Sequence, residues 1–146
     1  KFDSVIIADF EESLKSVITS LVYTDVSPKN KYFITFNQWF DESFIKEENV
    51  QPLYYPSINK KNLESFNKKF FKEYNTYPNH LSLLSYDLLG LIYYLSLKKD
   101  LTSSSVLFKK KISFKGKIGI FDIENNKINH RLNLYQVQDG ILKKVF

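Results

Sequence analysis

Two histidines, His80 and His130, are the only imidazole side chains among the 146 residues, and the chain has no cysteine. A closed zinc site needs about four Cys, His or carboxylate ligands at characteristic spacings. The two isolated histidines do not supply that set, so the sequence predicts no metal site and a structural role for each histidine. The lack of cysteine also excludes disulfides and thiol catalysis, but it does not select a compartment.

Nucleophilic catalysis has equally little support in the sequence. A Ser-His-Asp triad assembles only in three dimensions, so the sequence leaves it open. However, no serine lies in a nucleophile-elbow pattern, and the four glycines form no phosphate-cradling loop. We therefore expect a protein that is not an enzyme and that uses no cofactor.

Ligand-binding residues are predicted where the first two strands end. In parallel α/β sheets, ligands bind outside the carboxyl ends of the strands, where loops and helix N-termini present unpaired N–H groups. The candidates are Ala8, Asp9, Phe10, Asn37, Gln38 and Trp39. Trp39 either forms a wall of the site or packs under the following loop, and the sequence leaves both roles open.

These positions depend on a βαβ unit at the start of the chain. Ser4 to Ala8 is a short apolar run rich in β-branched residues, typical of a strand buried in a parallel sheet. Asp9 and Glu12 have the capping-box spacing that opens a helix, and Lys31 to Phe36 predicts the second strand. Val50 to Pro56 contains two prolines and predicts a short third strand near an edge.

Helices are expected in the middle of the chain. Lys60 to Tyr74 carries one apolar stripe, whereas Leu81 to Leu97 is apolar nearly all round and predicts a helix buried between other elements. Asp87 is the one anion of that helix and must be hydrogen-bonded or ion-paired if it is buried. Arg131 is either its partner or a solvated strand residue, and the sequence leaves both open. A short helical piece is expected from Ser103 to Lys110.

The last third of the chain predicts antiparallel strands. Gly116 and Gly119 lie at the mouth of the first, where a missing side chain permits a tight bend or close backbone approach. Asn and Gly residues tolerate the positive φ of hairpin turns. The expected strands are Phe114 to Asp122 and Lys127 to Gly140, and the expected turns are Asn125-Asn126 and Asp139-Gly140. The predicted fold class is α/β, with parallel βαβ units and a C-terminal antiparallel hairpin.

Several motifs carry a resemblance to a known family. They are Asp3-Ser-Val-Ile-Ile-Ala8, Tyr86-Asp-Leu-Leu89, Phe114-Lys-Gly-Lys-Ile-Gly-Ile-Phe-Asp122 and Asp139-Gly140, in this order. The sequence resembles the C-terminal half of the type I periplasmic binding proteins, which include leucine-binding-protein-like receptors of ABC transporters. Within that superfamily it is more similar to the penicillin-binding-protein activator lipoproteins. The resemblance covers almost the whole chain and implies a partial type I periplasmic-binding fold.

The resemblance also implies an organisation in two lobes. Residues 1–58 would belong to the second lobe, residues 59–122 mainly to the first, and residues 123–146 would return toward the second. The six candidate residues would then face the cleft between the lobes. Exposed apolar surface would be covered by an N-terminal portion of the same protein, by a second copy of the chain or by repacking.

Two functions are consistent with this resemblance. One is a receptor that binds a small polar ligand and acts with a membrane transporter; the other is regulation of a peptidoglycan synthase by protein contact. In the amino-acid receptors an acidic residue pairs with the ammonium group of the ligand, and the matching position here is Asn37, whose amide offers no charge pairing. This departure favours the regulator. The implied location is the periplasm, with a lipid anchor in a preceding segment.

The charge of the chain does not indicate a polyanion partner. The formal net charge is +5 and the isoelectric point is about 9.2. Lysines are spread along the sequence and Arg131 is the only arginine, whereas nucleic-acid readers cluster basic residues and use arginine forks. We expect no nucleic-acid partner and assign the lysines to solvated surface.

Overall fold

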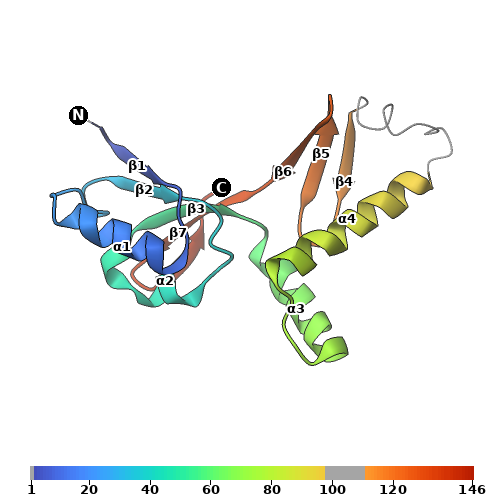
Figure 1. Cartoon of the computed structure of the whole chain (residues 1–146), viewed down its shortest axis with the longest axis horizontal. Coiled ribbons are helices and arrows are strands. Elements are labelled where there is room, and N and C mark those ends of the chain that lie inside the picture. Colours follow the sequence, from blue (N-terminus) through green and yellow to red (C-terminus); the bar gives the residue numbers. More distant parts are fainter. Residues whose placement is uncertain (1, 98–110) are drawn as a thin grey trace. The chain divides into compact units, whose positions relative to one another are not determined.

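The computed structural model describes residues 2–97 and 111–146 (Figure 1). The helical piece expected at 103–110 lies outside these residues. The chain divides into two compact units: unit 1 comprises Lys1–Ser57 and Asn133–Phe146, and unit 2 comprises Ile58–Leu132. The chain re-enters unit 1 at Asn133, later than the boundary at 123 expected from the sequence, because Lys127–Arg131 pairs within the sheet of unit 2.

Unit 1 is built on a five-stranded mixed sheet in the order β1-β2-β3-β7-β8. The first three strands are parallel, as the βαβ pattern predicts, and the last two are antiparallel. The strands are β1 (Ser4–Ile7), β2 (Tyr32–Thr35), β3 (Leu53–Ser57), β7 (Asn133–Gln138) and β8 (Ile141–Lys144). The turn between β7 and β8 has positive φ at Asp139 and Gly140, which confirms the predicted hairpin.

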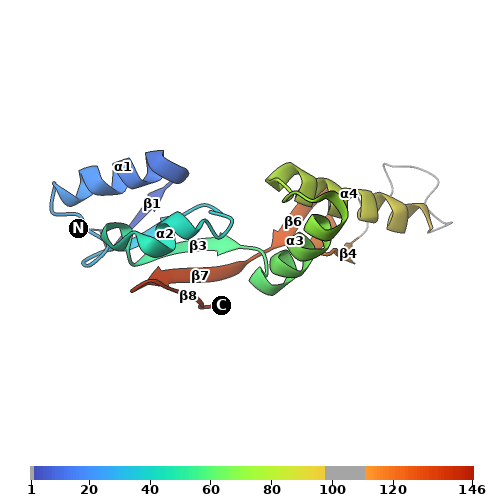
Figure 2. The ribbon, with the colours of Figure 1, turned by 90° about the horizontal axis from the view of Figure 1, so that it is seen from below.

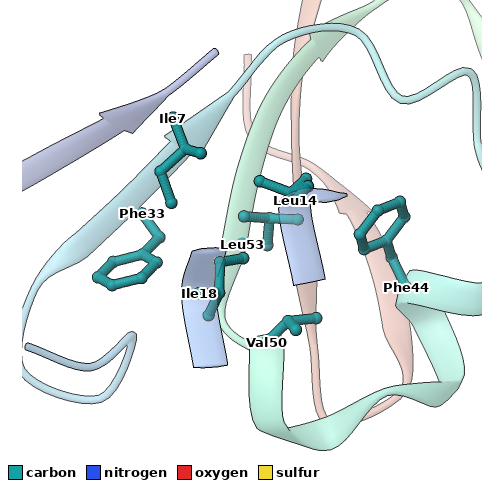
Figure 3. Packing of buried hydrophobic residues seen from close by; sticks show 7 residues of the cluster. All are labelled: Ile7, Leu14, Ile18, Phe33, Phe44, Val50 and Leu53. Atoms are coloured by element: carbon teal, nitrogen blue, oxygen red, sulfur yellow. The ribbon is translucent and has the colours of Figure 1, made fainter. Parts of the chain in front are cut away.

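Two helices, α1 (Glu11–Val22) and α2 (Glu42–Lys46), cover one face of this sheet (Figure 2). Leu14 and Ile18 on the apolar stripe of α1 are fully buried in one cluster with Phe33 of β2. That cluster, drawn in Figure 3, also contains Ile7, Phe44, Val50 and Leu53. The apolar period of α1 therefore fixes which face of the helix meets the sheet.

The third strand lies at the centre of the sheet, not near an edge as expected from its prolines. Pro56 is tolerated because β3 pairs with β2 only at Leu53 and Tyr54. The missing proline N–H therefore falls beyond the end of that hydrogen-bond ladder. On its other side, Pro56 lies opposite Leu134 of β7.

The second face of the unit 1 sheet exposes apolar side chains. Ile6 is 71% exposed, and Tyr32 on β2, which lies opposite Ser4, is also exposed. Tyr32 makes an edge contact with Tyr54, with ring centroids 5.8 Å apart, and the Tyr54 hydroxyl accepts a hydrogen bond from Gln136. We call this surface, lined by Ile6, Tyr32, Ile34 and Tyr54, the open face of unit 1.

Unit 2 combines two helices with a three-stranded antiparallel sheet in the order β4-β5-β6. The elements are α3 (Lys60–Tyr74), α4 (His80–Ser96), β4 (Ile112–Lys115), β5 (Ile120–Glu124) and β6 (Lys127–Arg131). Positive φ at Asn125 and Asn126 confirms the predicted turn between β5 and β6. A bond from the Gly116 N–H to the Gly119 carbonyl, at 2.8 Å, closes the bend that separates β4 from β5.

Helix α4 is not buried on all sides, contrary to the expectation from its apolar composition. Only the stripe containing Leu83, Asp87, Leu91 and Leu95 is buried, because the sheet of unit 2 covers a single side. Leu89, on another side, is 67% exposed. Among the described residues, no helix combines the length and the hydropathy that crossing a bilayer requires.

Asp87 holds the glycine bend of unit 2. It is 3% exposed, and the backbone N–H groups of Lys117 and Ile118 donate to its carboxylate at 2.6 and 3.0 Å. Any side chain at Gly116 would overlap with this carboxylate, so the close approach predicted for that glycine is confirmed. Arg131 is not the partner of Asp87, because its guanidinium donates hydrogen bonds to both carboxylate oxygens of Asp122.

His130 occupies the matching position beside the second glycine. Its half-buried ring stacks on Phe121 with centroids 4.3 Å apart, and a side chain at Gly119 would overlap with the imidazole. Burial lowers the pKa of His130, and the negative charge of Asp87 opposes that shift only in part. The ring is therefore neutral at pH 7 and acts as a packing element.

Candidate functional site

The six predicted residues lie at one edge of the unit 1 sheet. Ala8, Asp9 and Phe10 follow β1, and Asn37, Gln38 and Trp39 follow β2. Because β1 and β2 are parallel neighbours, with Ile7 opposite Thr35, their carboxyl ends meet at the same edge. We call this edge, together with Thr35, Phe36 and Ser57, the strand-end rim.

Gln38 ties the first two strand ends together. Its side chain is 5% exposed, and its amide nitrogen donates to the Asp9 carbonyl at 3.0 Å and to the Thr35 hydroxyl at 3.2 Å. The Thr35 hydroxyl in turn donates to the Ile7 carbonyl at 2.9 Å. The amide nitrogen of Gln38 is thus occupied by groups of the protein, and these bonds hold the two loops at a fixed separation.

Asn37 ties the second strand end to the third. Its Oδ1 accepts the backbone N–H of Trp39 at 3.0 Å and the hydroxyl of Ser57 at 2.7 Å. The bond from Trp39 closes an Asx turn two residues after Asn37, and Trp39 and Phe40 both have positive φ in the loop that follows. The loop after β2 is therefore anchored on both sides of the strand.

Asp9 adds a carboxylate to the end of β1. Its two oxygens accept the Ser13 hydroxyl at 2.7 Å and the Phe10 N–H at 2.9 Å. These bonds, first that from Ser13, keep the pKa of Asp9 below its usual value, so the group is ionised at neutral pH. The expected capping box is wrong: Phe10 is the N-cap residue and has no capping side chain, and Glu12 pairs with Lys15 instead.

Aromatic side chains flank the polar groups of the rim. The rings of Phe10 and Phe36 lie 6.0 Å apart, and both are about half exposed. Trp39 is half-buried, and Ala8 is exposed. The rim therefore combines one carboxylate, two side-chain amides and exposed ring surface, which is the mixture that orients small polar ligands.

Sequence reasoning missed Thr35, Phe36 and Ser57 as members of the rim. Ser57 ends β3, which is parallel to β2, so the rule that located the first two strand ends also applies to it. Ser57 was missed because the two prolines of this segment predicted a strand near an edge of the sheet. Thr35 was missed because its hydroxyl contacts Ile7 and Gln38, and no local sequence pattern predicts these contacts.

Two grooves lie elsewhere on the described residues. The larger, about 910 Å³, is at the opposite edge of the unit 1 sheet, between the end of α1 and the segments that precede β2 and β3. The smaller, about 390 Å³, is in unit 2 and is lined by Phe66, Phe70, Tyr74 and Tyr86. Neither groove contains a residue of the strand-end rim.

Solved structures match this chain over nearly its whole length. A Rhodospirillum rubrum protein described as a branched-chain amino acid ABC transporter aligns with 98% of the chain at a TM-score of 0.71 and 13% identity. The leucine binding protein LivK of Thermotoga maritima MSB8 aligns with 99% at 0.63 and 14%, and LpoA of Haemophilus influenzae with 97% at 0.59 and 14%. The chain has the type I periplasmic-binding fold.

The resemblance inferred from the motifs is thus confirmed as a likeness of fold. The chain spans 44% of the length of the Rhodospirillum and Thermotoga proteins and 26% of LpoA. No protein-family model matches the sequence, and no curated protein matches it.

Proposed function

We propose that unit 1 binds a small polar ligand at the strand-end rim, as part of an extracytoplasmic protein of periplasmic-binding type. The observation that carries this proposal is the network that joins the ends of β1, β2 and β3 through Gln38, Thr35, Asn37 and Ser57. A network of this kind fixes the loops before a ligand arrives, so less conformational entropy is lost on binding. The carboxyl edge of parallel strands is also where α/β folds place their ligands.

Each candidate residue has a role in this proposal. Asp9 and Asn37 make the polar contacts, Phe10 and Trp39 supply ring surface, and Ala8 leaves room for the ligand beside β1. Gln38 is a positioning residue. Unit 1 corresponds to part of the second lobe of a type I protein, and unit 2 corresponds mainly to the first.

The receptor form of this proposal involves a membrane transporter. Two of the matched structures are described as a branched-chain amino acid ABC transporter and a leucine binding protein, which supports a protein that presents its ligand to such a transporter. In that class, ligand binding selects a closed state that the transporter recognises.

A second candidate function is regulation of a peptidoglycan synthase by protein contact in the periplasm, with a lipid anchor preceding the chain. The observation that favours it is exposed apolar surface on both units, at Ile6 on the open face and at Leu89 on α4. Apolar patches of this kind mark protein-protein surfaces.

The same apolar surfaces also need cover within the assembled protein. We assign that cover to an N-terminal portion of the same protein or to a second copy of the chain. Sedimentation measures this directly: a monodisperse monomer that binds no hydrophobic dye would contradict the assignment.

A thermal-shift assay against amino acids and small metabolites tests the receptor. A ligand present at about 100 times its Kd stabilises the folded protein by about 2.7 kcal/mol, which raises Tm by several degrees. Asp9→Asn removes the charge of the rim but keeps an oxygen for the Phe10 N–H, and it should weaken binding about tenfold. Asp25→Asn, in the exposed turn after α1, is the matched control.

The outcomes separate the two candidate functions. A ligand whose effect depends on Asp9 and not on Asp25 supports the receptor. No shift with any compound, together with recovery of a peptidoglycan synthase in a pull-down, would overturn the receptor in favour of the regulator.

A further inference from the structure

Asn37 has a fixed orientation at the end of β2, and this orientation determines what it offers a ligand. Its Oδ1 accepts two hydrogen bonds, from the Trp39 N–H and from the Ser57 hydroxyl. A carbonyl oxygen has two lone pairs, so both are occupied. The amide oxygen is therefore unavailable to any further donor.

The amide cannot turn over to present its oxygen instead. A flipped side chain would place the Nδ2 hydrogens against the backbone N–H of Trp39, and a backbone N–H only donates. Only the two Nδ2 hydrogens of Asn37 remain, and they donate to no protein group among the described residues.

We infer that Asn37 selects a ligand that places a hydrogen-bond acceptor, a carbonyl or hydroxyl oxygen, against the end of β2, and that it rejects an ammonium group there. The inference rests on the proposed ligand site. An ammonium group carries only donors, so facing the Nδ2 hydrogens it would lose its hydration without gaining a bond.

The carboxylate of Asp9 complements this donor. Each of its oxygens accepts one hydrogen bond from the protein and keeps a lone pair for a ligand donor. Asn37 thus offers a donor to the ligand, and Asp9 offers an anionic acceptor. Hydroxyl and amide groups of a ligand satisfy either residue, since such groups donate and accept, whereas an ammonium group only donates and satisfies Asp9 alone.

The test compares matched ligands that differ only at the amino group. L-amino acids and the corresponding 2-hydroxy acids are titrated calorimetrically, with a panel of monosaccharides as neutral hydroxylated ligands. The expected result is binding of a hydroxylated compound and no binding of the amino acid with the same side chain. Monosaccharide binding assigns a neutral ligand, and hydroxy-acid binding assigns a carboxylate-bearing one.

Asn37→Asp tests the assignment to this residue. An aspartate can still accept both protein hydrogen bonds, so the fold is kept, but its second oxygen replaces the donor. The ratio of the two Kd values should move toward the ammonium ligand by at least about tenfold. Asn49→Asp adds the same charge to unit 1 ahead of β3, at the opposite edge of the sheet, and should leave the ratio unchanged.

Ser57→Ala provides an independent variant. It removes one of the two bonds on Oδ1, so the oxygen becomes available and discrimination against ammonium should weaken, by less than in Asn37→Asp. Binding of an amino acid that its 2-hydroxy analogue cannot replace would overturn the inference and leave the ligand site standing. Equal effects of Asn37→Asp and Asn49→Asp would also overturn it. No binding by any probe would overturn the ligand site itself.

Discussion

The two units use buried polar groups in different ways. Among the described residues, the buried polar side chains of unit 1 are Thr35, Gln38, Gln51 and Ser57, and that of unit 2 is Asp87. In unit 1, three of them, Thr35, Gln38 and Ser57, lie at one edge of the sheet and join three strand ends. In unit 2, one carboxylate holds a bend between two strands.

In the function proposed above, this difference corresponds to a difference in role. Buried hydrogen bonds are expensive to leave unmade, so a cluster of them at a sheet edge fixes that edge in one arrangement. Unit 1 therefore presents a rigid polar rim suited to a small ligand. Unit 2 leaves most of α4 apolar and exposed, which suits contact with further polypeptide.

The largest expected effect is the loss of the Asp87 carboxylate. Asp87→Asn turns one acceptor into a donor that faces the N–H of Lys117 or Ile118, and should destabilise unit 2 by about 3 kcal/mol. Hydrogen exchange should accelerate in β4–β6 and not in β1–β3. Fluorescence of Trp39, the only tryptophan, reports on unit 1 during urea unfolding. If the free energy of unfolding fell equally in both units, the units would unfold as a single cooperative block. The contrast drawn here between unit 1 and unit 2 would then be wrong.

A side chain at Gly119 should give the next largest effect. Gly119→Ala forces its Cβ against the His130 ring and should cost about 2 kcal/mol in urea unfolding. His130→Ala removes the obstacle, so the glycine substitution should cost much less in that background. A double-mutant cycle with no coupling between the two positions would contradict the packing described for unit 2.

Loss of the Gln38 amide should have a smaller and more local effect. Gln38→Leu removes the donor to the Asp9 carbonyl and should cost about 1 to 2 kcal/mol, with faster hydrogen exchange at the strand-end rim. Exposed Gln138, at the end of β7, provides the matched control Gln138→Leu. If Gln38→Leu left ligand affinity as unchanged as Gln138→Leu does, ligand binding at the strand-end rim would not require the Gln38 hydrogen bonds.

The smallest effect concerns the exposed pair in unit 2. The Arg131 guanidinium lowers the pKa of Asp122 below 3.8, so the pair stabilises the folded state above that pH. The contribution is lost as the pH falls through the lowered folded-state pKa. Tm measured from pH 6 to pH 2 should therefore fall slightly more in the wild type than in Asp122→Asn. Identical profiles would show that solvent screens the pair completely.

Much of the fold could be predicted from local patterns. The helix Lys60–Tyr74 has the bounds that its apolar stripe predicts, and the turns at Asn125-Asn126 and Asp139-Gly140 follow from residues that tolerate positive φ. The central place of β3 could not be predicted, because proline is disfavoured in ladders and nothing local shows that the β2 ladder ends before Pro56.

The sequence by itself determined the βαβ unit, the similarity in fold to the periplasmic binding proteins and the edge of the sheet that carries the candidate site. It also showed that a buried Asp87 requires hydrogen-bond or ion-pair partners. Only the tertiary structure decided that Gln38 is an internal tie, that Asn37 presents its nitrogen, and that Asp87 bonds backbone rather than Arg131. The reason is separation along the chain: periodicity and turn preferences act over a few residues, whereas these hydrogen bonds join residues 20 to 31 positions apart.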